Sequence, residues 1–306
     1  KYPLHKKKSC YNVGYQFTFC VILCINVEYM HYASQKREPQ GGVMIKVGII
    51  GCGHVGTAMK QLFVNAYLFD EPKKIGTRDE LNMCDLSFVC VPTPMAQDGS
   101  CDTTIVEQVL GWVDTPIIVI RSTVPIGFTE RMKKKTGKKI IFQPEYYGET
   151  IEHPFADLKN QRWITLGGDK DDSEIVVSAY QKVLTSDLFI NMVDSKTAEL
   201  AKYMENCFFA TKVTFCNEFY DLAMQMGVNY TELRETWLLD PRMGRSHTFV
   251  YSDNRGYGGA CLPKDISAIV YQGEKVCDMT LLKSVIEKND ILRKKMSNVC
   301  VDYEKI

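Results

Sequence analysis

The sequence predicts an α/β protein, in which a doubly wound, Rossmann-type parallel sheet is followed by an all-helical central domain. Three observations predict this fold class. Short β-branched runs alternate with helical segments at intervals of about 15 to 25 residues, which is typical of βα units. A glycine-rich loop follows the first of these runs, and a long helical pattern, Ser195–Met226, begins after the strand-like segments have become rare.

Length and composition restrict the class of protein. The chain has 306 residues, of which 45% are hydrophobic and 24% are charged, and 37 Lys and Arg balance 37 Asp and Glu. This composition excludes collagen-like, coiled-coil and wholly disordered chains, and it offers no basic excess to a nucleic-acid backbone. The 12 cysteines lack the spacing of a zinc site, so we predict thiols and no metal. The expected partners are a small molecule and a second copy of the chain, with neither nucleic acid nor membrane.

The first 43 residues differ in character from the rest of the chain. A basic patch, Lys6–Lys8, precedes an apolar run, Phe17–Val27, that is about half as long as a membrane-spanning helix. Such a run is compatible with a signal-peptide core or a short anchor. We favour an extension outside the fold, because Met44 opens a strand-like run in the way that a compact cytosolic protein begins.

The elements follow in order from Met44. Five strands are predicted at Ile45–Ile50, Ala66–Asp70, Leu86–Val91, Ile117–Arg121 and Lys139–Phe142. Four helices are predicted at Ser195–Met226, Tyr230–Leu238, Pro263–Glu274 and Thr280–Val299. At 1.5 Å per residue the first helix would extend about 48 Å, enough to join two domains or to pack against its copy in a dimer. The predicted domains are residues 44–193, which bind a dinucleotide, and residues 194–306, which are helical.

The loop after the first strand predicts a dinucleotide site. Gly51, Gly53 and Gly56 form the pattern G-x-G-x-x-G between a strand and a helix. The first glycine permits a tight turn, the second lets the backbone approach a pyrophosphate, and the third lets the helix pack closely on the strand. Asp70 ends the next strand 19 residues after Gly51, where a carboxylate would bind ribose hydroxyls and repel a 2′-phosphate. The sequence therefore predicts NAD rather than NADP.

A second glycine-rich segment, G-Y-G-G-A-C-L-P-K-D at 256–265, indicates a nucleophile. Its glycines clear space around Cys261, and Pro263 is predicted to be the first residue of a helix. A thiol at a helix N-terminus beside Lys264 ionises more readily than an ordinary thiol and can attack a carbonyl carbon.

This segment resembles the UDP-glucose/GDP-mannose dehydrogenase family, and the resemblance extends from Lys46 to about Met296. Further segments resemble the family in the same order: V-P-T-P at 91–94, S-T-V-P at 122–125, Q-P-E-Y-Y-G-E at 143–149, E-L-A-K-Y-M-E-N at 199–206 and D-P-R-M-G at 240–244. The resemblance implies catalytic roles for Cys261, Lys202, Asp265, Glu145 and Asn206. It implies cofactor contacts for Gly51, Gly53, His54, Val55, Gly56, Asp70, Thr93, Pro94, Thr123, Glu149 and Lys264, and substrate contacts for Tyr257, Gly258 and, from a partner subunit, Arg242.

The activity implied by the resemblance is an NAD-dependent, four-electron oxidation of a nucleotide-sugar primary alcohol to a carboxylate, with UDP-glucose favoured. Asp265, acting with a water, would take the hydroxyl proton while Lys202 stabilises the oxyanion. Cys261 would carry a thiohemiacetal and then a thioester, which is opened by water that Glu145 activates. Asn206 would orient the substrate hydroxyl and the water. The resemblance further implies a cytoplasmic enzyme of polysaccharide biosynthesis that dimerises through the long helix.

The chain departs from the family in two places, and two other functions stay open. The connection between Asp70 and Leu86 is shorter than in the family, and the domain that usually follows Thr280–Val299 and binds the nucleotide of the substrate is expected to be absent.

One alternative function is that of a two-electron β-hydroxyacid-type dehydrogenase, which also pairs a dinucleotide fold with a helix bearing Lys and Asn but needs no thiol. The other is an inactive NAD-binding, dimerising module or a fragment of a longer protein.

Overall fold

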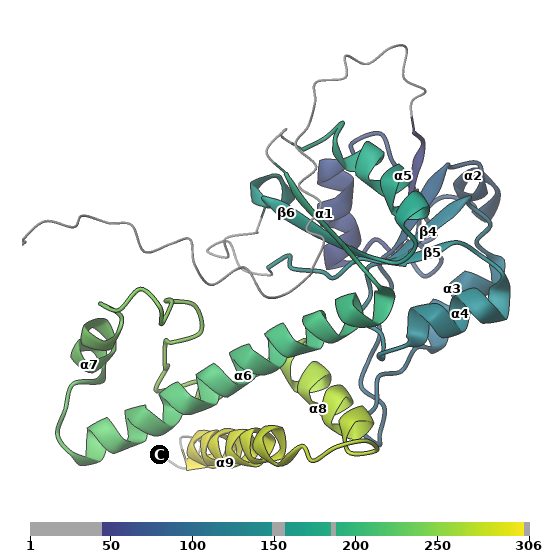
Figure 1. The fold of residues 1–306 in the computed structure, drawn as a ribbon. Coiled ribbons are helices and arrows are strands. Elements are labelled where there is room, and N and C mark those ends of the chain that lie inside the picture. Colours follow the sequence, from purple (N-terminus) through teal and green to yellow (C-terminus); the bar gives the residue numbers. More distant parts are fainter. Residues whose placement is uncertain (1–44, 149–156, 185–187, 303–306) are drawn as a thin grey trace, which may run out of the picture. The chain divides into compact units, whose positions relative to one another are not determined.

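The computed structural model describes residues 45–148, 157–184 and 188–302 (Figure 1), with side chains described as far as residue 294. The predicted extension, residues 1–43, therefore lies outside the described residues. None of the helices in the described ranges is long and apolar enough to cross a membrane. The eight cysteines described by their side chains form no disulfide with one another.

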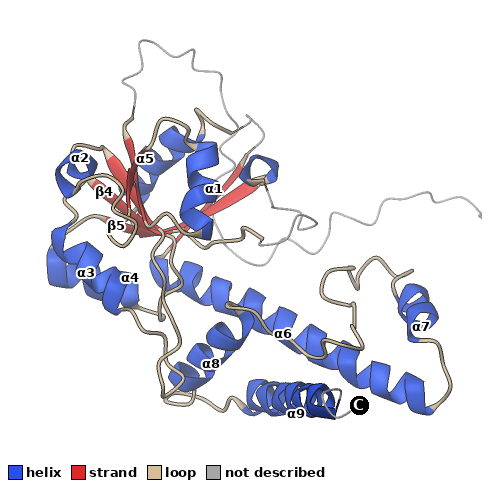
Figure 2. Cartoon of the chain, turned by 180° about the vertical axis from the view of Figure 1, so that it is seen from behind, coloured by secondary structure: helices blue, strands red, loops and turns tan. Residues whose placement is uncertain are grey.

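Seven strands in the first part of the described chain form one sheet (Figures 1 and 2). Their order is β2-β1-β3-β4-β5-β6-β7, and all neighbours run parallel except β5 and β6. The predicted doubly wound fold followed by helices is confirmed. The strands are β1 (Val47–Ile50), β2 (Tyr67–Phe69), β3 (Leu86–Val89), β4 (Ile117–Ile120), β5 (Ile140–Phe142), β6 (Trp163–Gly167) and β7 (Phe189–Val193).

The last two strands, β6 and β7, correct the sequence analysis, which predicted five strands. β6 (W-I-T-L-G) combines two β-branched residues with Trp and Gly, and β7 (F-I-N-M-V) is a partly exposed edge strand with Asn at its centre. Neither has the continuous apolar pattern of a central parallel strand. The antiparallel pairing of β5 with β6 also differs from the all-parallel prediction, and antiparallel neighbours need no crossover helix between them.

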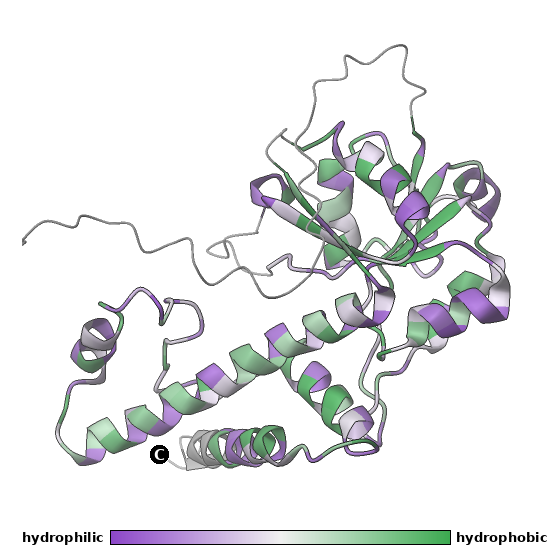
Figure 3. Cartoon of the chain, in the orientation of Figure 1, coloured by the Kyte–Doolittle hydropathy of each residue, from purple (hydrophilic) through white to green (hydrophobic). Residues whose placement is uncertain are grey.

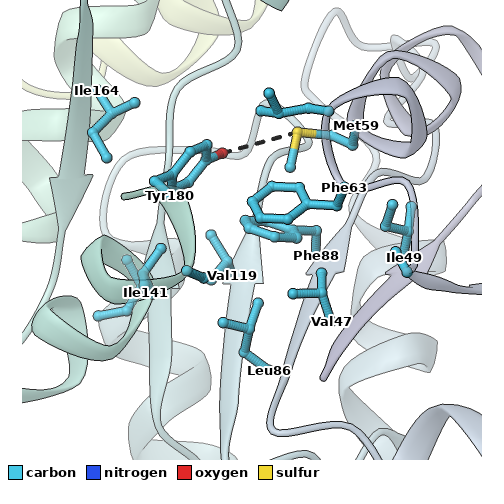
Figure 4. Close-up of a cluster of buried hydrophobic side chains, with 14 of the residues drawn as sticks. Val47, Ile49, Met59, Phe63, Leu86, Phe88, Val119, Ile141, Ile164 and Tyr180 are labelled. Atoms are coloured by element: carbon cyan, nitrogen blue, oxygen red, sulfur yellow. Dashed lines mark hydrogen bonds between the residues drawn. The ribbon is translucent and has the colours of Figure 1, made fainter. Parts of the chain in front are cut away.

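Both faces of the sheet are covered by helices, so its central strands are buried on both sides. Successive residues of a strand enter opposite cores: Ile49 packs with α1 (His54–Leu62) and α5 (Lys170–Tyr180), whereas Ile50 packs with α3 (Thr104–Trp112) and α4 (Phe128–Thr136). Figure 3 accordingly colours the central strands as mostly hydrophobic. In the first of these cores (Figure 4) the ring of Tyr180 meets that of Phe63 edge-on at 5.3 Å.

The strand order reverses at β1, which has β2 on one side and β3 on the other. Such a reversal opens a crevice at the carboxyl ends of the strands, where ligands of doubly wound folds bind. β2 forms the edge of the sheet. The short connection after it closes through a bridge between Asp70 and Ile75 and leads directly into α2 (Arg78–Asn82), in keeping with the shortening noted in the sequence.

The helical region follows the predicted boundaries closely. It consists of α6 (Ser195–Gln225), α7 (Tyr230–Trp237), α8 (Leu262–Gly273) and α9 (Thr280–Asp302). α8 begins one residue earlier than predicted, so Pro263 is its second residue. Both α8 and α9 pack on α6 around a core that includes Tyr203, Ile266 and Val285.

Two polar contacts attach the helical region to the sheet domain. The carboxylate of Glu199 on α6 accepts the backbone N–H of Gly127 at 2.5 Å and that of Thr129 at 2.9 Å, which are at the N-terminus of α4. Gln272 on α8 exchanges two hydrogen bonds, at 3.0 and 2.9 Å, with the backbone of Ile126. Helix N-termini favour such carboxylates. Glu199 itself is fully buried, and burial raises its pKa above the ordinary value of 4.5.

We expect Glu199→Ala to lower the free energy of unfolding by about 2–3 kcal/mol, because it leaves two buried N–H groups without an acceptor. Because the pKa of Glu199 is higher in the folded than in the unfolded protein, folding favours the protonated carboxyl. The contribution of this group to the free energy of unfolding is therefore complete below pH 4.5 and is lost as the pH rises through the raised pKa. Glu199→Gln should remove that part of the pH dependence. Urea unfolding at several pH values measures both effects, with the exposed Glu174→Gln as control. Equal pH profiles for wild type and Glu199→Gln would contradict the assignment.

Candidate functional site

A cavity of about 1090 Å³ opens at the carboxyl ends of β1, β3, β4 and β5, and it is lined by both the sheet domain and the helical region. All five residues with predicted catalytic roles line it. So do most of the residues with predicted cofactor contacts: Gly51, Gly53, His54, Val55, Asp70, Thr93, Pro94, Thr123 and Lys264. Among the described residues, no group of three or more His, Cys, Asp or Glu side chains could hold a metal ion.

The glycine-rich loop between β1 and α1 has the geometry that its sequence predicts. Gly51 has φ +90°, and a Cβ there would lie 2.8 Å from the carbonyl oxygen of Cys90, the residue that directly follows β3. A Cβ on Gly56 would lie 1.8 Å from the carbonyl oxygen of Gly51, so the helix can start this close to the strand only at a glycine. A Cβ on Gly53 would meet nothing within 4 Å, so the loop backbone is open on the side of the cavity that Gly51 and Gly53 line, which suits a pyrophosphate.

Asp70 lies at the end of β2 with its carboxylate held in place. One oxygen accepts the backbone N–H of Cys52 at 2.7 Å and the other accepts that of Lys73 at 3.0 Å. The Lys73 ammonium in turn donates to the carbonyl oxygen of Cys52 at 2.6 Å. Each carboxylate oxygen keeps a further lone pair for a ribose hydroxyl. The residues around this end of the cavity thus fit the adenosine ribose of NAD.

On the other wall, α6 and α8 join four polar side chains into one row. The Lys202 ammonium donates to the Asn206 amide oxygen at 3.3 Å, and the Asn206 amide nitrogen donates to Asp265 at 2.5 Å. Lys264 donates to the other oxygen of Asp265. Asn206 is 5% and Asp265 is 1% exposed, so their orientation is fixed by these bonds. The cation of Lys202 also lies 5.2 Å above the ring of Tyr146.

Cys261 immediately precedes α8 and lines the same cavity as Lys202 and Asp265. It is an exposed residue, as a nucleophile must be to reach a substrate. Its backbone carbonyl accepts the N–H of Asp265 at 2.9 Å, which begins the hydrogen bonding of the helix. The structure thus brings the thiol, the Lys–Asn–Asp row and the dinucleotide loop into one site.

Comparison with known proteins identifies the family. Residues 73–184 match the NAD binding domain of the UDP-glucose/GDP-mannose dehydrogenase family, and residues 196–291 match its central domain, together about two thirds of the chain. The chain belongs to the UDP-glucose/GDP-mannose dehydrogenase family. The first match makes NAD the cofactor of the sheet domain, as the sequence predicted.

Relatives of the chain carry the same family name. The chain is 30% identical over 230 residues to a putative UDP-glucose 6-dehydrogenase of Bacillus subtilis, covering 70% of this chain and 52% of the relative. It is 30% identical over 220 residues to the UDP-glucose 6-dehydrogenase of Streptococcus pneumoniae, covering 67% and 54%. The chain therefore spans about half the length of these curated relatives.

Solved structures agree in fold. A UDP-glucose dehydrogenase from Pyrobaculum islandicum superimposes with a TM-score of 0.72 at 26% identity, over 83% of this chain and 69% of that one. The 3-hydroxyisobutyrate dehydrogenase of Mycobacterium tuberculosis superimposes with a TM-score of 0.64 at 15% identity, over 83% of this chain and 94% of that one. The second likeness is one of fold alone.

Some residues that the family resemblance singles out do not line the cavity. Gly56 faces the backbone of Gly51 rather than the cavity. Tyr257 is 4% exposed and packs in the helical core, and Gly258 lies against Arg293. Arg242 is on the surface, with its side chain 81% exposed and paired with Asp240. Glu149 lies outside the described residues.

The sequence analysis missed residues that contact the predicted ones. Arg121, directly after β4, pairs with Glu145, and the ring of Tyr147 lies 4.7 Å from that of His54 at the start of α1. One signal for Arg121 was present in the sequence. Arg121 is a charged residue that directly follows the apolar run Ile117–Ile120 and directly precedes the S-T-V-P segment.

We expect Asp70→Asn to weaken NAD binding on the order of tenfold, because a charged acceptor of two ribose hydroxyls becomes neutral and one oxygen becomes a donor. The same change should reduce the preference for NAD over NADP. Calorimetric titration of the protein with each dinucleotide measures both, and the exposed Asp79→Asn serves as control. Unchanged NAD affinity in Asp70→Asn would place the ribose elsewhere.

Proposed function

We propose that this chain carries the catalytic part of an NAD-dependent nucleotide-sugar dehydrogenase, which oxidises the primary alcohol of a sugar such as UDP-glucose to a carboxylate. The observation that carries the proposal is the shared cavity, in which Cys261 and the Lys202–Asn206–Asp265 row face a dinucleotide loop. The names of the relatives favour UDP-glucose. A dinucleotide-dependent reaction that needs a reduced thiol suits the cytoplasm.

The first oxidation converts the alcohol to an aldehyde. Asp265, through a water, takes the proton of the hydroxyl group, and the ammonium of Lys202 stabilises the negative charge that develops on oxygen. The carbon then loses a hydride. NAD, when bound, would supply the hydride acceptor, with one NAD molecule consumed for this hydride and another for the second. Asn206, held by Lys202 and Asp265, orients the hydroxyl group.

The second oxidation takes place on Cys261. The thiolate adds to the aldehyde carbon, forming a C–S bond, and the oxygen gains a proton to give a thiohemiacetal. Loss of that proton and of a second hydride leaves a thioester. Water then forms a new C–O bond, the C–S bond breaks, and Glu145 takes a proton from the water. The carbon has lost four electrons as two hydrides and has gained one oxygen.

We also propose that residues 44–193 and 194–306 act as separate domains, since β7 ends at Val193 and α6 begins at Ser195. A homodimer through α6 is supported by a row of exposed apolar side chains on that helix and at its C-cap, Met226. They recur at intervals of mostly three or four residues, as one helix face requires: Leu200, Met204, Phe208, Phe215, Phe219, Leu222 and Met226. The exposed Arg242 would then be available to a partner subunit.

The proposed thioester route predicts that Cys261→Ser stops after one oxidation. With UDP-glucose and NAD, wild-type protein should yield two NADH for each uronate, whereas Cys261→Ser should yield no uronate and at most one NADH per sugar. The exposed Cys277→Ser is the matched control and should behave as wild type. Unchanged uronate formation by Cys261→Ser would refute the thioester route. Wild-type turnover that yields one NADH per substrate and no uronate, unchanged in Cys261→Ser, would favour the two-electron β-hydroxyacid-type dehydrogenase, and NAD binding without any NADH would favour an inert module.

The proposed dimer predicts that negative charges introduced on the exposed apolar face of α6 halve the mass of the particle in solution. We expect Met204→Glu combined with Phe208→Glu to convert a dimer into a monomer, because both side chains are exposed in the single chain and would be buried against the second copy. Analytical ultracentrifugation measures the mass. Glu substitutions at the exposed Val276 and Leu281, which lie off α6, are the control. A dimer that survives the α6 substitutions would refute this interface.

A further inference from the structure

A buried cation lies at the end of β4, and the mechanism proposed above does not use it. The side chain of Arg121 is 2% exposed. Its Nε donates to Oε2 of Glu145 at 2.9 Å, and its Nη2 donates to the same oxygen. Its Nη1 donates to the hydroxyl oxygen of Tyr180 at 3.1 Å. Each of the three guanidinium nitrogens therefore donates to either one carboxylate or one tyrosine.

Both anchors of Arg121 are themselves fixed. Tyr180, at the end of α5, donates its hydroxyl proton to Gln143 at 2.9 Å, and its ring packs in the core (Figure 4). The second oxygen of Glu145 accepts the backbone N–H of Tyr147. Glu145 thus has a contact on each oxygen, and its orientation at the cavity wall is set by residues from β4, β5 and α5.

The charge balance at this point depends on Arg121. The side chain of Glu145 is 11% exposed, and the cation that contacts it is the buried guanidinium of Arg121. The other titratable groups that sense its charge are Cys90, Tyr146 and Tyr180. Burial raises the pKa of each of them to about 12, so they are neutral at working pH. Burial opposes the charge on Arg121, but its contacts, of which that with Glu145 is the strongest, together outweigh burial and raise the pKa of the guanidinium.

We propose that Arg121 is the positioning residue that holds Glu145 ionised and aimed at the cavity. The inference rests on the proposed function, in which Glu145 accepts a proton from the water that opens the thioester. Arginine suits the task because its planar group reaches Glu145 and Tyr180 at once, whereas a lysine ammonium offers a single point of contact. Arg121 lines the cavity beside Glu145, and its proposed role is exerted through that carboxylate, without a proton transfer of its own.

The direct test is a titration of the Glu145 carboxyl without cofactor or substrate. Carbon-13 NMR of protein labelled at the glutamate carboxyls gives the midpoint, and the resonance is assigned by its loss in Glu145→Gln. In Arg121→Gln we expect the midpoint to rise by about one pH unit or more, because the paired cation is gone while the burial remains. Arg121→Lys should give a smaller rise and serves if Arg121→Gln does not fold. An unchanged midpoint in a folded variant overturns the proposal.

A second readout separates this proposal from the proposed function. In a single turnover with NAD and UDP-glucose, Arg121→Gln should retain NAD affinity and accumulate a uronyl adduct on Cys261, detected by mass spectrometry of the intact protein. Arg234→Gln is the matched control, because Arg234 is also buried, at 4% exposure, but does not line the cavity. If Cys261→Ser turns over normally, the thioester route fails. If Cys261→Ser arrests but Arg121→Gln neither shifts the titration nor accumulates adduct, the role of Arg121 alone fails.

Discussion

The carboxylate of Glu199 at the N-terminus of α4 is the contact on which the candidate site depends. Glu199 lies one turn before Lys202 on α6, so the bonds that hold it to Gly127 and Thr129 also set where Lys202 enters the cavity. Gln272 fixes α8 to the same loop through Ile126. Because α8 starts beside Cys261, the helices that carry the thiol and the ammonium are both bonded to the same short segment of the sheet domain, 126–129.

The sequence predicted the parts of the fold whose signals are local. Two examples are the strand–glycine–helix pattern around Gly51 and the 31-residue α6. Both could be predicted because their signals come from residues that are consecutive in the sequence. β6 and β7 were missed because their burial comes from neighbours in the sheet and their own composition is mixed. The Arg121–Glu145 pair was missed for a similar reason. It joins residues 24 apart that become neighbours only when β4 and β5 pair in parallel.

The cavity has two walls of different character. The sheet side offers backbone and one carboxylate, as at Gly51 and Asp70, and this arrangement recognises a dinucleotide by shape and hydrogen bonding. The helical side offers a thiol and a row of polar and charged side chains, from Lys202 to Lys264, which are the groups proposed to act on the substrate. The dinucleotide loop and the proposed catalytic residues are thus supplied by different parts of the chain, and the proposed reaction needs both.

Tyr180 links two regions that are usually considered apart. Its ring packs in the hydrophobic core beside Met59 and Phe63. Its hydroxyl oxygen accepts a hydrogen bond from Arg121, the residue proposed to position the Glu145 carboxylate. A substitution that enlarges or loosens that interior would therefore tilt the ring and disturb the chemistry from a distance. In a mutational scan, losses of turnover would be found at apolar positions that no ligand touches.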